Sequence, residues 1–538
     1  MENNRTILAI VLVILLWSGY SLFFTPKQPA PQPVVAESAK PDKVIVKKEE
    51  APPSPVKEEG QVQAVAVKPA DYVEKIITVS SNLYDLQVST TGATVRSMVL
   101  KKYRASTASD SELYPLIKST SEQLATLKIS GSEGLSIPTD LPFQTDSQAE
   151  KVVLKDKEEK AIRFTATTSS GLTVVKSFIF HGDSYQIDIQ IQLVNNGPQP
   201  VKGIANVSLI SAWDKTQKGG TYNFIGPVTF DGEKLHEDKP TDLLKSAKIY
   251  GKEIKWSGFT NKYFLMIMAP LNSAMKQIQV DAGDGYVENR FASPFLTLNA
   301  GQTASFGYVS FFGPKDYDLL KASDHQFERA IDYGFFRILA HPLMIVLKFF
   351  YGFIGNYGVA IILLTICIKI IFWPLTQKSY KSMKGMQKLQ PQMQKLREKY
   401  GNDKQRLNQE MMAFYKENRV NPMGGCLPML IQIPVFFALY RVLLGSIELR
   451  HAPFMFWITD LSAKDPYYVT PLIMGVTMFI QQKMTPSNMD PNQAKIMLMM
   501  PVVFTFLFLN FPSGLVVYWL TNNLLTILQQ YLIRRQPD

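Results

Sequence analysis

Long apolar runs near both ends of the chain constrain its fold more than any other feature. The run from Ile7 to Phe24 contains no charged residue, and the stretch from Asp332 to Pro374 is mostly apolar and about twice as long as one membrane-spanning helix requires. Charged residues make up 19% of the 538 residues, below the roughly 25% of ordinary soluble domains. We therefore expect a membrane protein with several spans.

Residues 1–25 are predicted to form an uncleaved transmembrane anchor. A cleaved signal peptide would have a shorter apolar region and an exit of small residues, whereas here Phe24 leads directly into Thr25 and Pro26. Residues 26–70 are rich in Pro, Lys, Glu and Val without apolar periodicity. Because such a segment cannot bury enough apolar surface to fold, we interpret it as a disordered linker.

Strand-like alternation marks the next domain, residues 71–316. Its clearest example runs from Tyr185 to Leu193, where apolar and polar residues alternate strictly before a turn that begins at Asn195. A period of two places the apolar side chains on one face of a strand. We expect an all-β sandwich of antiparallel strands.

The last 200 residues are predicted to be helical and largely within the membrane. Arg337, His341 and Lys348 interrupt an apolar stretch at spacings near multiples of a helical turn, which favours an amphipathic helix in the membrane interface. The predicted fold class is thus a polytopic α-helical membrane protein with six transmembrane helices and an all-β sandwich domain outside the membrane. Its helical parts are an interfacial helix (330–353), the second span (354–376), a cytoplasmic helical hairpin (377–425), spans three to six (426–533) and a cytoplasmic tail (534–538).

Charge asymmetry sets the predicted orientation. The chain has a net charge of +11, and the segment 377–425 carries eleven Lys or Arg against four acidic residues. Loops rich in Lys and Arg stay in the cytoplasm. Counting spans from this loop places both termini in the cytoplasm and the sandwich on the outer side of the membrane.

No motif for bond-making chemistry is present. The chain has no phosphate-binding loop, nucleophile elbow, HExxH or CxxC motif, and its five histidines are scattered. The two cysteines, Cys367 and Cys426, exclude a disulfide scaffold and a four-cysteine metal site. We expect no metal, no cofactor and no enzymatic activity.

Two charged residues lie inside predicted spans, Lys369 and Arg441. A charge near the bilayer centre costs at least about 2.5 kcal/mol, so such residues usually face a cavity or water. The alternative for both is that the side chain reaches the interface. Thr365 lies one turn before Lys369, and Gln432 lies on the third span, so we predict a hydrophilic groove between spans. No acidic residue lies inside a predicted span, which disfavours a proton-coupled transporter.

The cytoplasmic hairpin has a methionine-rich seam. Met386, Leu389, Met393, Leu396 and Tyr400 are spaced three and four apart, as in a coiled coil, and Gly401-Asn402-Asp403 predicts a break before a second helix. The methionines are either the core of the hairpin or an adaptable surface for apolar partners. Its basic exterior could meet anionic lipid or ribosomal RNA. The predicted contact surface consists of Met383, Met386, Met393, Met411 and Met412.

Several motifs in order resemble those of the YidC/Oxa/Alb family of membrane protein insertases. They are residues 404–412 (KQRLNQEMM), 420–436 (VNPMGGCLPMLIQIPVF), 465–468 (DPYY), 475–479 (GVTMF) and 511–519 (FPSGLVVYW). The anchor and the large outer sandwich are similar to the arrangement of Gram-negative members, which implies a bacterial inner membrane protein whose sandwich lies in the periplasm.

This resemblance implies an insertase and membrane chaperone with a groove open to cytoplasm and lipid. The family's groove arginine corresponds to Lys369, which keeps the charge but loses the bidentate geometry. Thr365, Gln432 and Phe436 match groove or substrate-path positions, and Trp519 stands where Tyr is common. The implied partners are nascent membrane proteins, the Sec translocon, the ribosome, the signal recognition particle or its receptor, and membrane lipids. Direct DNA binding is not expected.

A second hypothesis from another class is a channel or small-solute transporter with a sugar-binding outer sandwich. Internal repeats or intramembrane acids would support it, and the sequence shows neither. The outer sandwich could also be only a spacer or a partner-docking surface.

Overall fold

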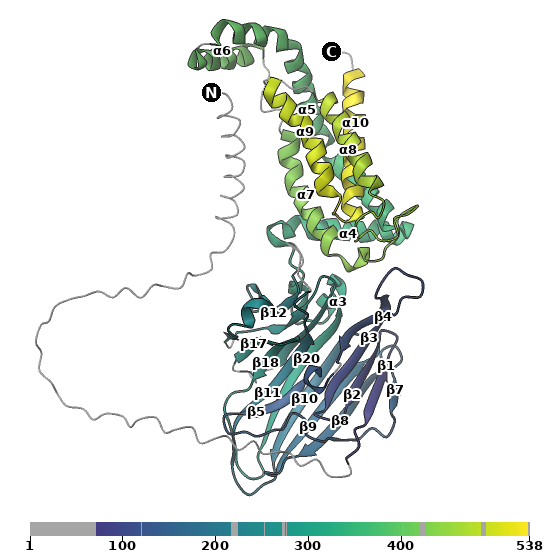
Figure 1. Ribbon diagram of the computed structural model, residues 1–538, viewed down its shortest axis with the longest axis vertical. Coiled ribbons are helices and arrows are strands. Elements are labelled where there is room, and N and C mark those ends of the chain that lie inside the picture. Colours follow the sequence, from purple (N-terminus) through teal and green to yellow (C-terminus); the bar gives the residue numbers. More distant parts are fainter. Residues whose placement is uncertain are drawn as a thin grey trace, which may run out of the picture. The chain divides into compact units, whose positions relative to one another are not determined.

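The computed structural model describes residues 72–119, 121–216, 224–251, 253–271, 275, 277–401, 403–418, 427–485 and 491–535 (Figure 1). The predicted anchor and linker lie outside these described residues.

The β region begins with a five-stranded sheet in the order β4-β3-β2-β1-β7. Neighbouring strands in it are antiparallel, except that β1 and β7 are parallel. Its strands are β1 (Ile76–Ser80), β2 (Tyr84–Ser89), β3 (Thr94–Arg104), β4 (Leu113–Lys118) and β7 (Lys151–Val153).

A nine-stranded antiparallel sheet has the order β13-β12-β15-β16-β20-β10-β9-β8-β6. Strands β8, β9 and β10 follow one another as hairpins, whereas β20 returns from the end of the domain to pair with β10. The strands are β6 (Gln144–Thr145), β8 (Glu159–Thr167), β9 (Leu172–His181), β10 (Gln186–Asn195), β12 (Gly226–Phe230), β13 (Leu235–Glu237), β15 (Trp256–Thr260), β16 (Phe264–Leu271) and β20 (Thr303–Pro314).

A third, six-stranded sheet runs β14-β17-β18-β11-β19, with β5 also paired to β11. The short helix η1 (Glu122–Leu124) precedes β5. The strands are β5 (Lys128–Ser132), β11 (Val201–Ala212), β14 (Lys248–Tyr250), β17 (Gln277–Gly283), β18 (Tyr286–Ala292) and β19 (Leu296–Leu298).

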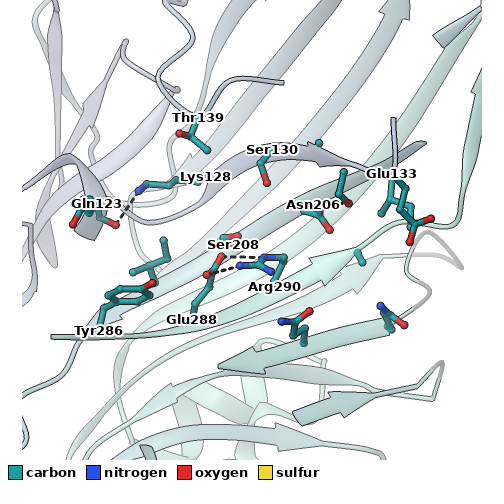
Figure 2. A pocket seen from close by; sticks show the side chains of 17 residues that line it. Gln123, Lys128, Ser130, Glu133, Thr139, Asn206, Ser208, Tyr286, Glu288 and Arg290 are labelled. Atoms are coloured by element: carbon teal, nitrogen blue, oxygen red, sulfur yellow. Dashed lines mark hydrogen bonds and ion pairs between the residues drawn. The ribbon is translucent and has the colours of Figure 1, made fainter. Parts of the chain in front are cut away.

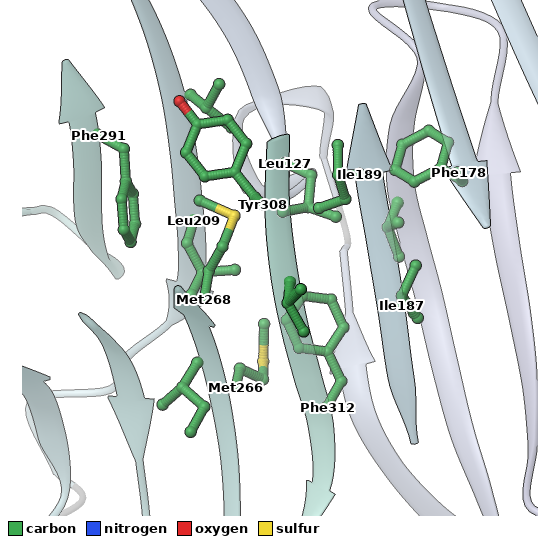
Figure 3. Close-up of a cluster of buried hydrophobic side chains, with 14 of the residues drawn as sticks. Leu127, Phe178, Ile187, Ile189, Leu209, Met266, Met268, Phe291, Tyr308 and Phe312 are labelled. Carbon is green, nitrogen blue, oxygen red and sulfur yellow. The ribbon is translucent and has the colours of Figure 1, made fainter. Parts of the chain in front are cut away.

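Side chains from the three sheets share one apolar core. In β10 the alternation in the sequence predicts which side chains face inward, and Ile187, Ile189 and Ile191 are fully buried while Gln190 and Gln192 are exposed. The prediction for this strand is confirmed, and the large share of β-sheet in this region agrees with the expected all-β domain. The expectation of antiparallel strands throughout is wrong for β1 and β7, which are parallel. Figure 3 labels core residues from several strands, among them Leu209, Met268, Phe291, Tyr308 and Phe312.

The chain continues almost entirely as helices (Figure 1). Helix α10 packs against α5, α7 and α8, and α4 packs against α5 and α7. The bounds are α2 (Pro240–Leu243), α3 (Tyr317–Ala322), η2 (Phe327–Ala330), η3 (Gly334–Phe336), α4 (Arg337–Ile354), α5 (Tyr357–Tyr400), α6 (Lys404–Glu417), α7 (Leu427–Gly445), η5 (Ile447–Leu449), α8 (Val469–Met484), α9 (Pro491–Phe508) and α10 (Ser513–Arg535).

Helix α5 runs without a break through the expected boundary between the second span and the hairpin. It ends at Tyr400, and α6 starts at Lys404, where the Asp403 side chain accepts hydrogen bonds from the backbone N–H groups of Gln405 and Arg406. An aspartate at this position satisfies backbone donors that the first helical turn leaves open. The end of α5 and the start of α6 therefore lie where the sequence indicates them.

Two helical stretches among the described residues are long and apolar enough to cross a membrane, Gly334–Ile354 and Tyr357–Tyr400. Gln432–Gly445 and Met497–Phe508 are apolar but shorter. The number of six spans therefore stays a prediction. Around α4, Phe335, Ile338 and Phe353 are strongly exposed, while Met344 and Leu347 are buried. Apolar side chains therefore occur on both the exposed and the buried side of this helical stretch.

Candidate functional site

Helix α10 carries a row of polar side chains on its buried face. Asn522, Thr526 and Gln529 follow one another at spacings of four and three, and Asn523 and Gln530 lie beside them; all five are buried. Buried polar groups require hydrogen-bond partners. The partners of this row therefore define how α10 is fixed to its neighbours. We call these five residues the α10 polar row.

Two side chains of the α10 polar row bond to the predicted groove residues. Lys369 Nζ on α5 donates to Thr526 Oγ1 at 2.7 Å. Gln432 Nε2 on α7 donates to Asn522 Oδ1 at 2.5 Å. Lys369 on α5 and Gln432 on α7 are thus both bonded to α10.

The other members of the row extend the contacts along α5 and α8. Gln529 Nε2 donates to Thr376 Oγ1 on α5 at 2.8 Å. On α8, Asn523 Nδ2 donates to Thr477 Oγ1 at 3.3 Å. Gln530 Nε2 donates to Thr485 Oγ1 at 3.1 Å, so the row connects α10 to three helices.

Lys369 is half-buried and has an uncharged partner. The Thr526 hydroxyl donates its own proton to the Asn522 backbone carbonyl at 2.7 Å, so its oxygen accepts from the lysine. No carboxylate within the described parts of the chain lies within ion-pairing distance of Lys369 Nζ. An ammonium has three N–H donors, so this cation retains capacity to meet an anionic group from outside.

Thr365 is placed differently from Lys369. It is 1% exposed, and its hydroxyl donates to the Ile361 carbonyl of the same helix at 2.7 Å. A threonine bonded back to its own helix satisfies its donor locally. The structure gives Thr365 no hydrogen bond to the α10 polar row among the described residues.

Phe436 and Trp519 belong to an aromatic cluster. Their rings lie edge to face with centroids 4.8 Å apart. Trp519 also contacts Phe508 at 5.0 Å and Phe504 at 6.1 Å, which brings α9 to the same place. Such edge contacts add to the apolar packing of the rings. Apart from Thr365, which bonds within its own helix, the predicted groove residues therefore fall into a polar pair, Lys369 and Gln432, and an aromatic pair.

The methionines of the hairpin differ in exposure. Met383 and Met393 are 5% and 3% exposed, and Met386 and Met411 are half-buried. Met412 is 63% exposed. Within the predicted contact surface, Met412 is the methionine most accessible to a partner.

The α10 polar row was not among the residues predicted from the sequence. A usable signal was present, since Asn522, Thr526 and Gln529 recur at helical spacing in a helix that is otherwise mostly apolar. The motif at 465–468 contains a second residue whose role was not predicted, Asp465, which is fully buried before α8. It accepts hydrogen bonds from Trp457 Nε1 at 2.9 Å and from the backbone N–H of Thr470 at 2.8 Å.

Hydrogen bonding determines the charge state of Asp465. Burial raises the pKa of this carboxyl, but the bonds from Thr470, Tyr467 and Trp457 outweigh burial and leave the pKa below its usual range. A carboxylate with several donors favours its charged form. Asp465 is therefore an anion, and its hydrogen bonds hold the segment that leads into α8.

Candidate metal ligands are not clustered in the described residues: no group of three or more His, Cys, Asp or Glu side chains is placed to hold a metal ion. The arrangement of the α10 polar row offers hydrogen bonds and one cation. Its chemistry is that of binding.

A domain rich in β-sheet, followed by apolar helices that enclose a polar row, defines a membrane protein with a large domain outside the bilayer. Residues 76–346 match the family model described as YidC periplasmic domain, and residues 349–538 match the model described as 60Kd inner membrane protein. The chain belongs to the YidC family and is an inner membrane protein with a periplasmic domain.

Relatives match over nearly the whole chain. A protein of Geotalea daltonii named membrane protein insertase YidC is 45% identical over 535 residues, covering 99% of both chains. A protein of the same name from Geobacter sulfurreducens is 46% identical and covers 99% of this chain and 98% of its own. A solved structure described as an active YidC insertase with the first transmembrane domain resolved is 18% identical, with a TM-score of 0.36, and covers 86% of this chain and 93% of its own.

Proposed function

We propose that this protein is a membrane protein insertase and membrane chaperone. The name of its relatives supports the activity, and the hydrogen bond between Lys369 and Thr526 is the observation that carries the mechanism. It holds a cation beside uncharged polar groups of α10. The same face of the bundle would form the hydrophilic groove that the sequence predicts.

The physical problem of insertion is the passage of a short polar tail through hydrocarbon about 30 Å thick. A polar row that reaches into the bilayer shortens the apolar path, because water and side chains replace lost hydrogen bonds. Lys369 would attract acidic groups of the passing tail. Since its partner in the resting state is a neutral hydroxyl, no ion pair has to break first.

The free energy for insertion would come from the substrate. Transfer of about 20 apolar residues from water to lipid is strongly favourable at about 25 cal/mol per Å² of buried apolar surface. The aromatic pair Phe436 and Trp519 lies on α7 and α10, the same helices as Gln432 and Asn522. We assign it to the apolar part of the substrate, because aromatic rings pack well against apolar side chains.

The proposed partners follow from the family and from the hairpin. Nascent membrane proteins are the substrates, and the ribosome, the signal recognition particle or its receptor would meet the basic hairpin. Exposed Met412 on α6 offers an adaptable apolar contact there. The Sec translocon is a further proposed partner. The proposed topology has six spans and both termini in the cytoplasm.

Reconstitution tests the activity directly. A small single-span protein with an acidic outer tail is offered to liposomes with and without this protein, and protection of the tail from protease is measured. We expect protection only with the protein present. Equal protection in empty liposomes would contradict the proposal, and flux of small solutes without tail protection would favour the transporter hypothesis instead.

Site-specific crosslinking tests the path. A photoreactive phenylalanine derivative replaces Phe436 in one variant and Phe506, which is 68% exposed on α9, in a control. With a ribosome-bound nascent single-span protein, we expect stronger crosslinks at Phe436. Equal crosslinks at both positions would contradict a substrate path along α7 and α10.

A further inference from the structure

A polar groove of about 650 Å³ lies on the six-stranded sheet of the periplasmic domain (Figure 2). It occupies the face opposite the apolar core, because the intervening residues Ile129, Val207 and Phe291 point into that core. Its lining residues come from β5, β11, β17, β18 and the two segments that flank β5. They include Ser130, Asn206, Ser208, Gln277, Gln279 and Arg290.

Strand register arranges these side chains in two rows across the sheet. Ser208 on β11 pairs with Lys128 on one side and with Arg290 on the other, and Arg290 pairs with Gln279. Residues paired in this way point to the same face of a sheet. The rows consist of Lys128, Ser208, Arg290 and Gln279, and of Ser130, Asn206, Ala292 and Gln277.

Much of the groove floor is buried although it faces away from the core. Ser208, Asn206 and Glu288 are 3%, 5% and 9% exposed. Gln123 and Thr139, from the segments before and after β5, line the groove (Figure 2). A concave site with buried polar groups on its floor differs from a flat, solvated sheet face.

The polar groups are held in place by bonds to one another. Arg290 binds Glu288 through two nitrogens, Nη2 at 2.8 Å and Nε at 3.3 Å (Figure 2). Asn206 Nδ2 donates to Ser132 Oγ at 3.0 Å, and Lys128 Nζ donates to the Gln123 carbonyl at 2.8 Å. Groups fixed before binding lose less entropy when a ligand arrives.

The charges of the lining cancel. Lys128 and Arg290 are opposed by Glu133 and Glu288, and the remaining polar lining residues are hydroxyls and amides. A ligand with a strong net charge would gain little from such a surface. A mainly apolar ligand would displace water from these polar groups without offering hydrogen bonds for their remaining donors and acceptors, which is costly.

We propose that this groove binds a neutral glycan. Sugar hydroxyl groups donate and accept hydrogen bonds, as the serines and amides of the two rows do. The planar side chains of Arg290, Glu288 and Asn206 can each meet neighbouring hydroxyls. Tyr286 adds an aromatic ring at the groove. The ring packs against Gly283, where a β-carbon would lie only 2.3 Å from the nearest ring atom.

An extended peptide fits this place less well. Peptides add to sheets through free backbone edges. Here β11 and β18 have paired neighbours on both sides, so the groove presents side chains instead of backbone groups. This inference concerns the periplasmic domain alone and does not depend on the proposed insertase activity.

The test uses the full-length protein in a detergent without a sugar head group, because a glycoside detergent would compete. Chitotriose is the neutral probe, and its fully deacetylated, cationic form is the charge control. Binding is measured by calorimetry. We expect saturable binding of chitotriose and at least tenfold weaker binding of the cationic form.

Two matched variants place the binding in the groove. Ser130→Leu puts a branched apolar side chain into one polar row, and Ser305→Leu makes the same change at an exposed position of β20 outside the groove. We expect at least a tenfold loss of chitotriose affinity in the first variant and none in the second. Circular dichroism checks that both variants are folded.

Absence of saturable chitotriose binding would overturn the proposal. So would tighter binding of the cationic probe, or equal losses in Ser130→Leu and Ser305→Leu. If Ser130→Leu does not fold, Gln277→Leu on β17 is compared with Gln192→Leu on β10 by the same criteria, because Gln277 lines the groove and Gln192 is exposed elsewhere.

Discussion

Lys176 is a lysine inside the apolar core of the periplasmic domain. It is fully buried, and its Nζ donates to the carbonyls of Ala93, at 2.7 Å, and Leu127. Burial lowers its pKa from 10.5 to about 7. Because the unfolded chain then binds more protons than the folded chain between pH 7 and 10.5, the contribution of this group to stability rises with pH over that range.

This shift predicts a pH dependence that Lys176→Met should remove. Relative to that variant, the free energy of unfolding of the wild type should rise by up to about 1.4 kcal/mol per pH unit between pH 7 and 10.5. Below pH 7 the difference between the two proteins should not change with pH. Thermal unfolding of the protein at pH 6, 8 and 10 measures the difference. Lys160→Met, at an exposed position of β8, is the control. Parallel pH profiles for wild type and Lys176→Met would contradict this explanation.

At the scale of elements, the bond between Gln432 on α7 and Asn522 on α10 predicts a measurable coupling. Asn522→Leu leaves the Gln432 amide without this partner and should lower stability by about 1 kcal/mol, within the range for hydrogen bonds between membrane helices. Thermal unfolding of Asn522→Leu, Gln432→Leu and the double variant gives the coupling energy. Strictly additive losses would show that the contact contributes nothing.

A second prediction at this scale concerns the segment before α8. Asp465→Ala removes the acceptor of the Trp457 and Thr470 bonds and should destabilise this segment by about 1–3 kcal/mol. Since the folded pKa of Asp465 is depressed, its contribution should be present above about pH 4 and decrease as pH falls further. Limited proteolysis after Ala463 and Lys464 at pH 7 reports the effect. Asp460→Ala, in the same loop, serves as a comparison, and equal cleavage of wild type and Asp465→Ala would refute the role of this carboxylate.

The sequence predicted elements better than it predicted contacts between them. Strict alternation in β10 identified Ile187 and Ile189 as core residues, and Asp403 marked the start of α6. The bond between Lys369 and Thr526 joins residues 157 positions apart. Apolar periodicity within a single helix cannot predict a contact between two helices. The polar groove on the six-stranded sheet likewise depends on cross-strand register, which brings Ser208 beside Arg290 and cannot be derived from either strand alone.

At the scale of the whole molecule, the hairpin should receive nascent chains. Met412→Glu places a charge at a methionine that is 63% exposed, and Gln409→Glu adds the same charge at an exposed polar position of α6. We expect delivery of ribosome-bound chains to proteoliposomes to fall several-fold only in Met412→Glu. Deletion of residues 384–415 should abolish co-translational delivery, and full delivery by this deletion variant would disprove the role of the hairpin.

In the proposed mechanism, Lys369 acts on the substrate as a positive charge among neutral polar groups. The most direct measurement compares insertion rates of a single-span substrate with an acidic or a neutral tail in proteoliposomes of wild type, Lys369→Met and Lys369→Arg. Methionine keeps the length of the side chain without its charge, and Thr526 keeps its own bond to the Asn522 carbonyl.

For the acidic tail we expect Lys369→Met to insert at least about fivefold more slowly, which corresponds to about 1 kcal/mol, and Lys369→Arg to remain near wild type. For the neutral tail the three proteins should insert at similar rates. Equal rates for the acidic tail in all three proteins would contradict an electrostatic role of Lys369.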